Sequence, residues 1–363
     1  MRKYLAIIIL LSIVTIEASA QGCVAIRSTG ASCTRQSLDS ATAKGWQLNT
    51  SYRYFRSFRH FVAKEEQKER LENNTEVINW SHSVTFSLVR NLNSRWSLGI
   101  DVPVISNKRS SLYEHGGNAA GESARHNTSS FGLGDVRLVA YRWLLDPAKN
   151  MKGNIQLGLG LKLATGDYQY QDFFVKADGS KVLGPVDQSI QLGDGGTGFT
   201  AEVNTYFNFT HTIGVYGNFY YLFNPREQNG TSTARGGAPS ATALAYNTST
   251  MSVPDQFMVR MGGNVMFNRF AASAGVRVEG IPSKDLIGGS GGFRRPGYVV
   301  SIEPGVNYTM KKATIFATVP VAIERNRTQS TGDEARTVAT GIYAHGDAAF
   351  ADYLVNVGVS FKF

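Results

Sequence analysis

The stretch that decides the fold is the carboxy-terminal one, Tyr353-Leu-Val-Asn-Val-Gly-Val-Ser-Phe-Lys-Phe363. Its odd-numbered residues are aromatic or branched aliphatic, and its even-numbered residues are mostly small or polar. Successive side chains of a β-strand point to opposite faces, so this stretch has one apolar face and one polar face. Such a strand, closing a chain on an aromatic residue, is typical of the last strand of a bacterial outer-membrane β-barrel.

The amino terminus indicates export. A basic Met1-Arg-Lys-Tyr4 precedes the apolar run 5–16, and Ala18-Ser-Ala20 supplies a cleavage signal. We therefore predict a secretory signal peptide over residues 1–20. Beyond it the chain has no run of about 18 apolar residues, so no transmembrane helix is expected.

Composition supports many strands. The chain of 363 residues has 38 Gly, 20 Phe and 16 Tyr but only 10 Pro. Its formal net charge is +9, yet the basic residues are scattered and form no Lys/Arg-rich run, which argues against nucleic acid as a partner. Basic loops that face anionic lipopolysaccharide or an anionic ligand explain the charge more simply.

Alternation of apolar and polar residues recurs in about twelve segments. It is clearest in Ile155-Gln-Leu-Gly-Leu-Gly-Leu-Lys-Leu-Ala164, where every odd-numbered residue is Ile or Leu. The predicted strands are 45–60, 77–91, 95–106, 130–144, 153–166, 197–210, 213–225, 255–267, 269–282, 297–310, 313–326 and 350–363.

The connections between these strands alternate in length. The long ones cover 61–76, 107–129, 167–196, 226–254, 283–296 and 327–349, and each is followed by a short turn. Long outer loops and short periplasmic turns are the pattern of an outer-membrane barrel, whereas a soluble β-sandwich has no reason to keep it. The fold prediction is an all-β, antiparallel transmembrane barrel of about 12 strands over residues 45–363.

Charged residues fall on the inward face of these strands, because a charge on the lipid face costs about 2–4 kcal/mol at mid-bilayer. They either line an aqueous path and tune its selectivity, or form a salt-bridge network that stiffens the wall. The predicted lumen-lining residues are Arg53, Asp101, Asp135, Arg137, Lys162, Glu202, Arg260, Arg277, Glu279, Glu303, Glu324 and Lys362.

Cys23 and Cys33 are the only cysteines. In an oxidising periplasm they are expected to form a local disulfide, although Cys23 is also a candidate for lipid attachment. The weakly patterned segment 21–44 that contains them is predicted to fold into the lumen as a plug, or else to lie in the periplasm. A barrel of about twelve strands has a lumen that admits small solutes or such a plug.

No catalytic motif is present, so neither an enzyme nor a cofactor is expected. Two loop features remain. Arg294 and Arg295, in the glycine-rich loop 288–297, could bind an anion or fold into the barrel mouth. His115, His126 and His345 are weak candidates for a metal site, since scattered loop histidines are more often solvated.

Phe131-Gly-Leu-Gly-Asp-Val-Arg-Leu-Val-Ala-Tyr-Arg-Trp143 follows the strand that ends in Asp101-Val-Pro-Val104. This pair, together with 157–167, resembles the outer-membrane barrel family labelled "MetA-pathway of phenol degradation". The part of the chain that shows this resemblance is about half of its length. It implies a transporter-like barrel linked to uptake of aromatic or other hydrophobic compounds, and it implies no catalytic residues.

We therefore predict a protein of the cell outer membrane that acts as a passive channel for small solutes, with aromatic or hydrophobic compounds as candidates. The alternative is a plugged scaffold barrel that presents its outer loops to a partner without transport. Expected partners are outer-membrane lipid and lipopolysaccharide, a small-molecule solute, and the barrel-assembly machinery through the C-terminal strand. The sequence leaves the oligomeric state open.

Overall fold

The computed structural model describes residues 44–363. The predicted signal peptide, the predicted Cys23–Cys33 disulfide and residues 21–43 of the predicted plug lie outside the described residues. No helix in the described part of the chain is long and apolar enough to cross a membrane.

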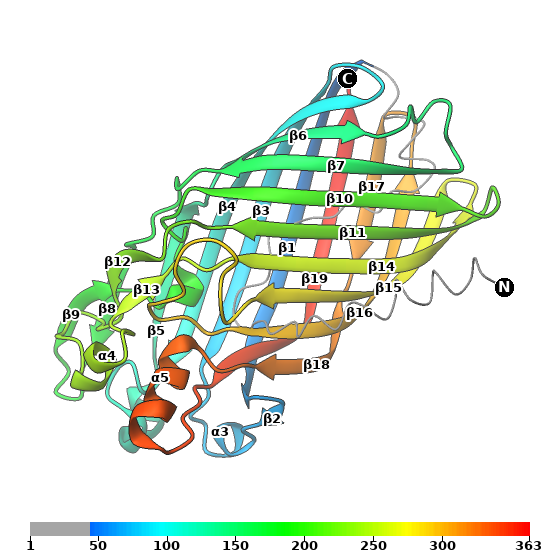
Figure 1. Cartoon of the computed structure of the whole chain (residues 1–363). Coiled ribbons are helices and arrows are strands. Elements are labelled where there is room, and N and C mark those ends of the chain that lie inside the picture. The colour runs from blue at the N-terminus through cyan, green and yellow to red at the C-terminus, as the bar shows by residue number, and fades with distance from the viewer. Residues whose placement is uncertain (1–43) are drawn as a thin grey trace.

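Residues 45–362 form a closed antiparallel β-barrel of twelve wall strands, as predicted (Figure 1). The first and last strands close it, with a ladder that runs from Gln47 opposite Lys362 to Phe61 opposite Ala348. The wall strands are β1 (Gly45–Val62), β3 (Ile78–Asn91), β4 (Trp96–Ser111), the interrupted pair β5 (His126–Leu133) and β6 (Arg137–Trp143), β7 (Gly153–Lys162), β10 (Gly198–Asn208), β11 (Ile213–Phe223), β14 (Gln256–Phe267), β15 (Phe270–Ile281), β16 (Gly297–Thr309), the interrupted pair β17 (Ala313–Thr318) and β18 (Val321–Arg327), and β19 (Ala348–Lys362).

The long connections all lie at one end of the barrel, which the sequence assigns to the cell exterior (Figure 1). The short turns, such as 209–212 and 268–269, lie at the other end. The outer connections contain β2 (Glu65–Glu66), α3 (Glu69–Glu72), the 3₁₀ helices η1 (Asn118–Ala124) and η2 (Gln188–Ile190), the hairpins β8 (Gln171–Val175) with β9 (Lys181–Pro185) and β12 (Gln228–Ser232) with β13 (Thr250–Ser252), α4 (Ala241–Ala245), and α5 (Thr331–Thr340).

Burial follows the predicted alternation, but with the polarity of a soluble protein reversed. On β7 the outward Ile155, Leu157 and Leu159 are exposed, and the exposed fraction of Leu159 is 71%. The inward Asn154 and Lys162 on the same strand are buried. Apolar side chains on the outside and polar ones inside are what a barrel in lipid requires.

Two wall strands, which the sequence predicts to be continuous, are interrupted. Residues 134–136 separate β5 from β6, and Val319 and Pro320 separate β17 from β18. Proline has no backbone N–H to donate to a ladder, so a break at Pro320 is expected physically. The Pro320 carbonyl still accepts a hydrogen bond from the Leu354 N–H at 3.0 Å, which keeps the broken strand attached to β19.

Glu324 corrects the prediction for the lumen. Thr318 pairs with the inward Gly305 on β16, so simple alternation would turn Glu324 inward as well. A bulge in β18 adds one residue between Ala322 and Glu324, and Glu324 pairs with the outward Val300. A one-residue slip sends a side chain to the opposite face of the sheet. The Glu324 carboxylate lies 2.7 Å from Lys64 Nζ on the outer surface.

Two glycines in the barrel wall leave room for the ring of Tyr216, which lies on the lumenal side. Gly262 and Gly275 face each other on β14 and β15, and Tyr216 is directly opposite Gly262 on β11. A Cβ on Gly262 would lie 2.7 Å from the Tyr216 hydroxyl oxygen, and a Cβ on Gly275 would lie 2.8 Å from it. The two glycines therefore form the surface on which Tyr216 packs.

Gly275→Leu should destabilise the barrel by about 1–3 kcal/mol, because the added side chain must displace Tyr216 in a packed lumen. The measurement is urea unfolding of the refolded protein in lipid vesicles, followed by tryptophan fluorescence. Gly263→Leu is the matched control, because this neighbouring β14 glycine faces lipid and the nearest atom to its Cβ is 3.7 Å away. Equal unfolding midpoints for the two variants would contradict the packing argument.

Candidate functional site

Register and burial place the other predicted lumen residues on the inner face of the wall. Asp101, Arg137 and Lys162 line one cavity there, together with Asp135 at the break between β5 and β6. Lys362 lies at an inward register position at the periplasmic end, opposite Gln47. The remaining six are nine-tenths or more buried: Arg53, Glu202, Arg260, Arg277, Glu279 and Glu303.

The first group of these residues joins strands across the lumen. We call Arg53, Arg260, Arg277, Glu279 and Glu303 the Arg260 cluster. Arg260 Nη1 lies 3.0 Å from Glu303, and Arg277 Nη2 lies 2.8 Å from Glu279. Arg53 on β1 reaches Glu279 on β15 at 3.9 Å, although three wall strands separate β1 from β15 around the barrel. These contacts are those expected of a network that stiffens the wall.

A second group, the Arg137 cluster, lies on β4, β6 and β10. The Arg137 guanidinium donates through Nε to Asp101 at 2.8 Å and also pairs with Glu202. The Tyr141 hydroxyl donates to Glu202 at 3.2 Å. The Arg137 guanidinium thus compensates both carboxylates, and the Tyr141 hydroxyl adds a hydrogen bond to Glu202.

Lys162 ties an outer loop to the wall. Its ammonium group contacts the carboxylate of Asp194, in the loop between η2 and β10, and lies 3.7 Å from Asp135. Asp135 also accepts hydrogen bonds from the backbone N–H groups of Gly166 at 3.0 Å and Asp194 at 3.2 Å. This loop is therefore held against the inner wall at the level of the strand break.

Three outer loops meet over the lumen and form what we call the cap: 164–197, 226–254 and 283–296. Gln188 in the first loop donates through Nε2 to the carbonyl of Ser252 at 2.9 Å and to that of Phe293 at 3.1 Å. One side chain thus bonds to both of the other loops. No pattern in the sequence predicts this contact, because it joins three outer loops that are far apart in the chain.

Asp187, next to Gln188, is the centre of a buried ion-pair cluster that the sequence did not reveal. Its carboxylate accepts two hydrogen bonds from Arg295, at 2.8 and 2.7 Å. It also lies 3.4 Å from Arg109 Nη2 and 3.8 Å from Arg235 Nη2. Glu114 shares Arg109 and Arg235, so three guanidinium groups surround two carboxylates.

Arg294 and Arg295 are buried in the cap, and each guanidinium group is paired with one of the protein's own carboxylates. Arg294 donates to both oxygens of Asp285 at 2.8 Å, and Arg295 binds Asp187 in the same two-point manner. The loop 288–297 therefore folds into the barrel mouth, which was one of its two predicted roles. Binding of an external anion by these two arginines stays a prediction.

The candidate histidines do not gather into one site. The rings of His115 and His126 are 5.4 Å apart, and His115 Nδ1 accepts a hydrogen bond from the Val175 N–H. Burial lowers the pKa of His115 to about 4, so its ring is neutral at pH 7. His345 instead hydrogen-bonds the Gly346 carbonyl oxygen. Residues 44–363 contain no group of three or more His, Cys, Asp or Glu side chains that could hold a metal ion.

Three cavities adjoin the cap. One, of about 520 Å³, lies beside Arg294 and Arg295 toward β1 and β19. The other two, an inner and an outer one, have lining residues in common. The inner one has a volume of about 140 Å³ and is lined by wall residues of the Arg137 cluster and by the lumenal side of the loops. The outer one has a volume of about 410 Å³ and lies among the outer loops. Gln188 and Met251 line both cavities and therefore form the partition between them.

Asp187→Asn should loosen the cap by about 3–5 kcal/mol, because it leaves the buried charges of Arg109 and Arg295 poorly compensated. We expect faster hydrogen exchange and proteolysis of the three cap loops, with the barrel itself intact. Asp178→Asn is the matched control, since this exposed carboxylate belongs to the turn of the β8–β9 hairpin. Unchanged protection of the cap in the Asp187 variant would refute its central role.

The ion pairs of Asp187 should also resist mild acid. Burial by itself would raise the pKa of Asp187, but the charges of Arg109 and Arg295 outweigh burial and hold that pKa well below 3.8. A depressed carboxyl pKa stabilises the fold fully above the unfolded value and loses this effect as the pH falls through the folded value. The measurement is the difference in corrected hydrogen exchange of the cap between the native protein and Asp187→Asn, because this difference removes the loss that the lowered pKa of His115 causes below pH 6.5 in both proteins. The difference should be constant from pH 8 to about pH 5 and shrink only below pH 3.8, and a decrease near pH 6 would contradict this assignment.

No family model and no curated protein matches the chain. Among solved structures, the COG4313 outer membrane channel from Pseudomonas putida F1 is 11% identical, with a TM-score of 0.57 over 88% of this chain and 96% of that chain. A Pseudomonas aeruginosa FadL homologue is 9% identical, with a TM-score of 0.44 over 95% and 99% of the two chains. The Ralstonia pickettii toluene transporter TbuX is 11% identical, with a TM-score of 0.40 over 88% and 90%. The last two scores carry no weight in the assignment. The first likeness and the closed barrel show the fold of an outer-membrane β-barrel, and the protein is located in the outer membrane.

Proposed function

We propose that this protein is an outer-membrane channel for the passive uptake of small solutes, in particular aromatic or hydrophobic compounds. The observation that supports this function is the pair of cavities at the barrel mouth, which Gln188 and Met251 both line. A solute that passes this partition enters the lumen at the level of the Arg137 cluster. The lumen-lining charges would then determine which solutes continue.

The inner cavity has the lining expected for a neutral solute with an apolar body. Pro103, Leu222, Met251, Pro254 and Ile281 contribute apolar surface. The charged groups there are paired with one another, as Arg137 is with Asp101. Pockets for small molecules are typically apolar with a few placed polar groups. Paired charges attract a free ion less than a single uncompensated charge would, so selection by size and polarity is the expected mode.

The partition can open without disrupting the barrel, because it consists of loop residues. Met251 contributes a flexible apolar side chain, which adapts readily to a changing neighbour. Gln188 is held by two hydrogen bonds to backbone carbonyls, each worth about 0.5–1.5 kcal/mol net. The barrier is therefore of a size that thermal motion of the loops can overcome.

Gln188→Ala combined with Met251→Ala should increase the passage of solutes, because it removes the two side chains that separate the cavities. The measurements are single-channel conductance in planar bilayers and flux of phenol into vesicles that contain the refolded protein. Gln169→Ala with Met261→Ala is the matched control, since both residues are exposed and neither lines a cavity described above. Absence of both conductance and flux in the native protein and in the partition variant would refute the channel function.

A scaffold barrel without transport is the second candidate, and the cap favours it. The cap holds three loops together through Gln188 and through the Asp187 cluster, which would suit a rigid surface for a partner. The experiment above separates the two functions, because a scaffold should remain silent even when the partition is removed.

We also propose membership of the phenol-degradation barrel family, contact with lipopolysaccharide, and recognition of β19 by the barrel-assembly machinery. The pairing of β19 with β1 closes the barrel, which supports a role for this strand in assembly. We propose no enzymatic activity, since the sequence contains no catalytic motif.

A further inference from the structure

Three side chains form a row on the outer surface of β1, β3 and β4, and we call them the Trp80 row. Arg56 pairs with Trp80 in the ladder of β1 and β3, and Trp80 pairs with Lys108 in the ladder of β3 and β4. Their chain neighbours Asn79 and Asn107 are buried on the inner face, so the row points outward.

The two cations of the row share one aromatic ring. Arg56 Cζ lies 5.9 Å from the centroid of the Trp80 ring, and Lys108 Nζ lies 5.7 Å from it. Arg56 also lies over Phe58, at 4.3 Å. Cation–π contacts of this kind position a charged group while leaving its hydrogen-bond donors free.

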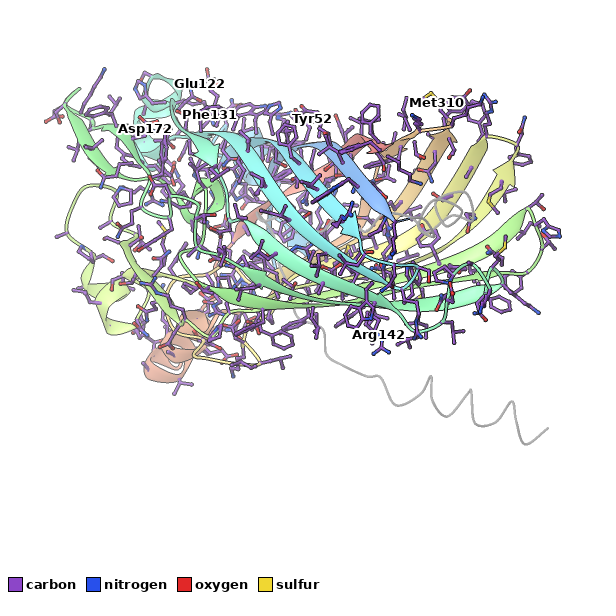
Figure 2. The ribbon with its side chains drawn as sticks, turned by 90° about the horizontal axis from the view of Figure 1, so that it is seen from above. Tyr52, Glu122, Phe131, Arg142, Asp172 and Met310 are labelled. Carbon is purple, nitrogen blue, oxygen red and sulfur yellow. The ribbon has the colours of Figure 1, made fainter. Side chains whose placement is uncertain are left out.

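The length of the strands gives the depth of the row in the membrane. Trp46 and Arg90 pair with each other at the periplasmic end of β1 and β3. Arg56 and Trp80 lie ten residues farther along these strands. A strand crosses the hydrocarbon core in about 9–11 residues, so the Trp80 row lies at the interface with the outer leaflet. Figure 2 shows Phe131 near Asp172 and Glu122, at the end of the barrel that carries the loops, and Tyr52 farther from that end.

The cations of the row have no carboxylate partner. No ion pair or side-chain hydrogen bond of Arg56 or Lys108 is present among residues 44–363, whereas Lys64 on the same rim pairs with Glu324. Asp172, on β8, accepts hydrogen bonds from the N–H and hydroxyl of Ser129, the residue opposite Lys108. The donors of both cations are thus available to a ligand from the membrane.

We propose that the Trp80 row binds the phosphate group of an anionic glycolipid in the outer leaflet. Arg56 and Lys108 would each donate to phosphate oxygens, since guanidinium and ammonium groups form strong charge-assisted hydrogen bonds with phosphate. The Trp80 ring, at headgroup depth, would contact the sugar. The outward Phe86 and Phe131, both exposed, would contact the acyl chains. This inference does not depend on whether solutes pass through the lumen.

The test compares lipid binding by the full folded barrel and two double variants. The first is Arg56→Gln with Lys108→Gln. The second is the matched control, Arg90→Gln with Arg142→Gln, because these arginines lie over Trp46 and Trp96 in the same way at the periplasmic rim. Folding of each protein is checked by its heat-dependent mobility on gels. The probes are bisphosphorylated lipid A and its dephosphorylated form, added to detergent-solubilised protein and counted by native mass spectrometry.

We expect the native protein and the Arg90/Arg142 variant to bind bisphosphorylated lipid A equally, and the Arg56/Lys108 variant to bind it at least about tenfold more weakly, as for a loss of about 1.4 kcal/mol. The dephosphorylated lipid should bind no better to the native protein than to the Arg56/Lys108 variant. Equal binding of bisphosphorylated lipid A by all three proteins would overturn the proposal. An equal loss in both double variants would also overturn it, because the effect would then come from overall charge and not from this row.

Discussion

The structure depends on one constraint: a chain in lipid must satisfy every backbone hydrogen bond by itself. Each wall strand meets this by pairing with its neighbours, and the pairing of β1 with β19 removes the last open edge. The carbonyl of Phe363 accepts a hydrogen bond from the N–H of Trp46 at 2.8 Å, so the ladder continues to the last residue. Closure then dictates which side chains face lipid and which face the lumen, because the two faces alternate along every strand.

Closure also explains why charge is concentrated inside. The lipid face of the wall strands carries Ile, Leu and Phe, whereas the lumen holds arginines and carboxylates that are almost completely buried, such as Arg277 and Glu303. Buried charges are stable only when they are paired. The Arg260 and Arg137 clusters provide this pairing, and the contact between Arg53 and Glu279 spans the barrel. The same residues thus stabilise the barrel and line the lumen that a solute would enter.

The cap is held together by other interactions than the wall. Its loops cannot rely on a continuous ladder, so side chains hold them: Asp187 with Arg295, Asp285 with Arg294, and Gln188 with two carbonyls. Loops fastened by a few strong contacts can be rigid yet open locally when those contacts break. The rigidity of the cap supports the scaffold and its local opening supports the channel, so the partition at Gln188 and Met251 is the decisive element.

The sequence by itself determined the barrel, its strand number and the inward position of most lumen charges, because alternation along a strand is a local property and the cost of charge in lipid fixes its phase. It failed at Glu324, since a bulge after Pro320 reverses the phase and no local pattern announces it. It also missed the strand break at 134–136 and the cluster around Asp187. That cluster joins Arg109, Asp187 and Arg295, which are far apart in the chain and lie partly in aperiodic loops. Only the tertiary structure brings such residues together, because contacts between loops depend on how the whole barrel positions their ends.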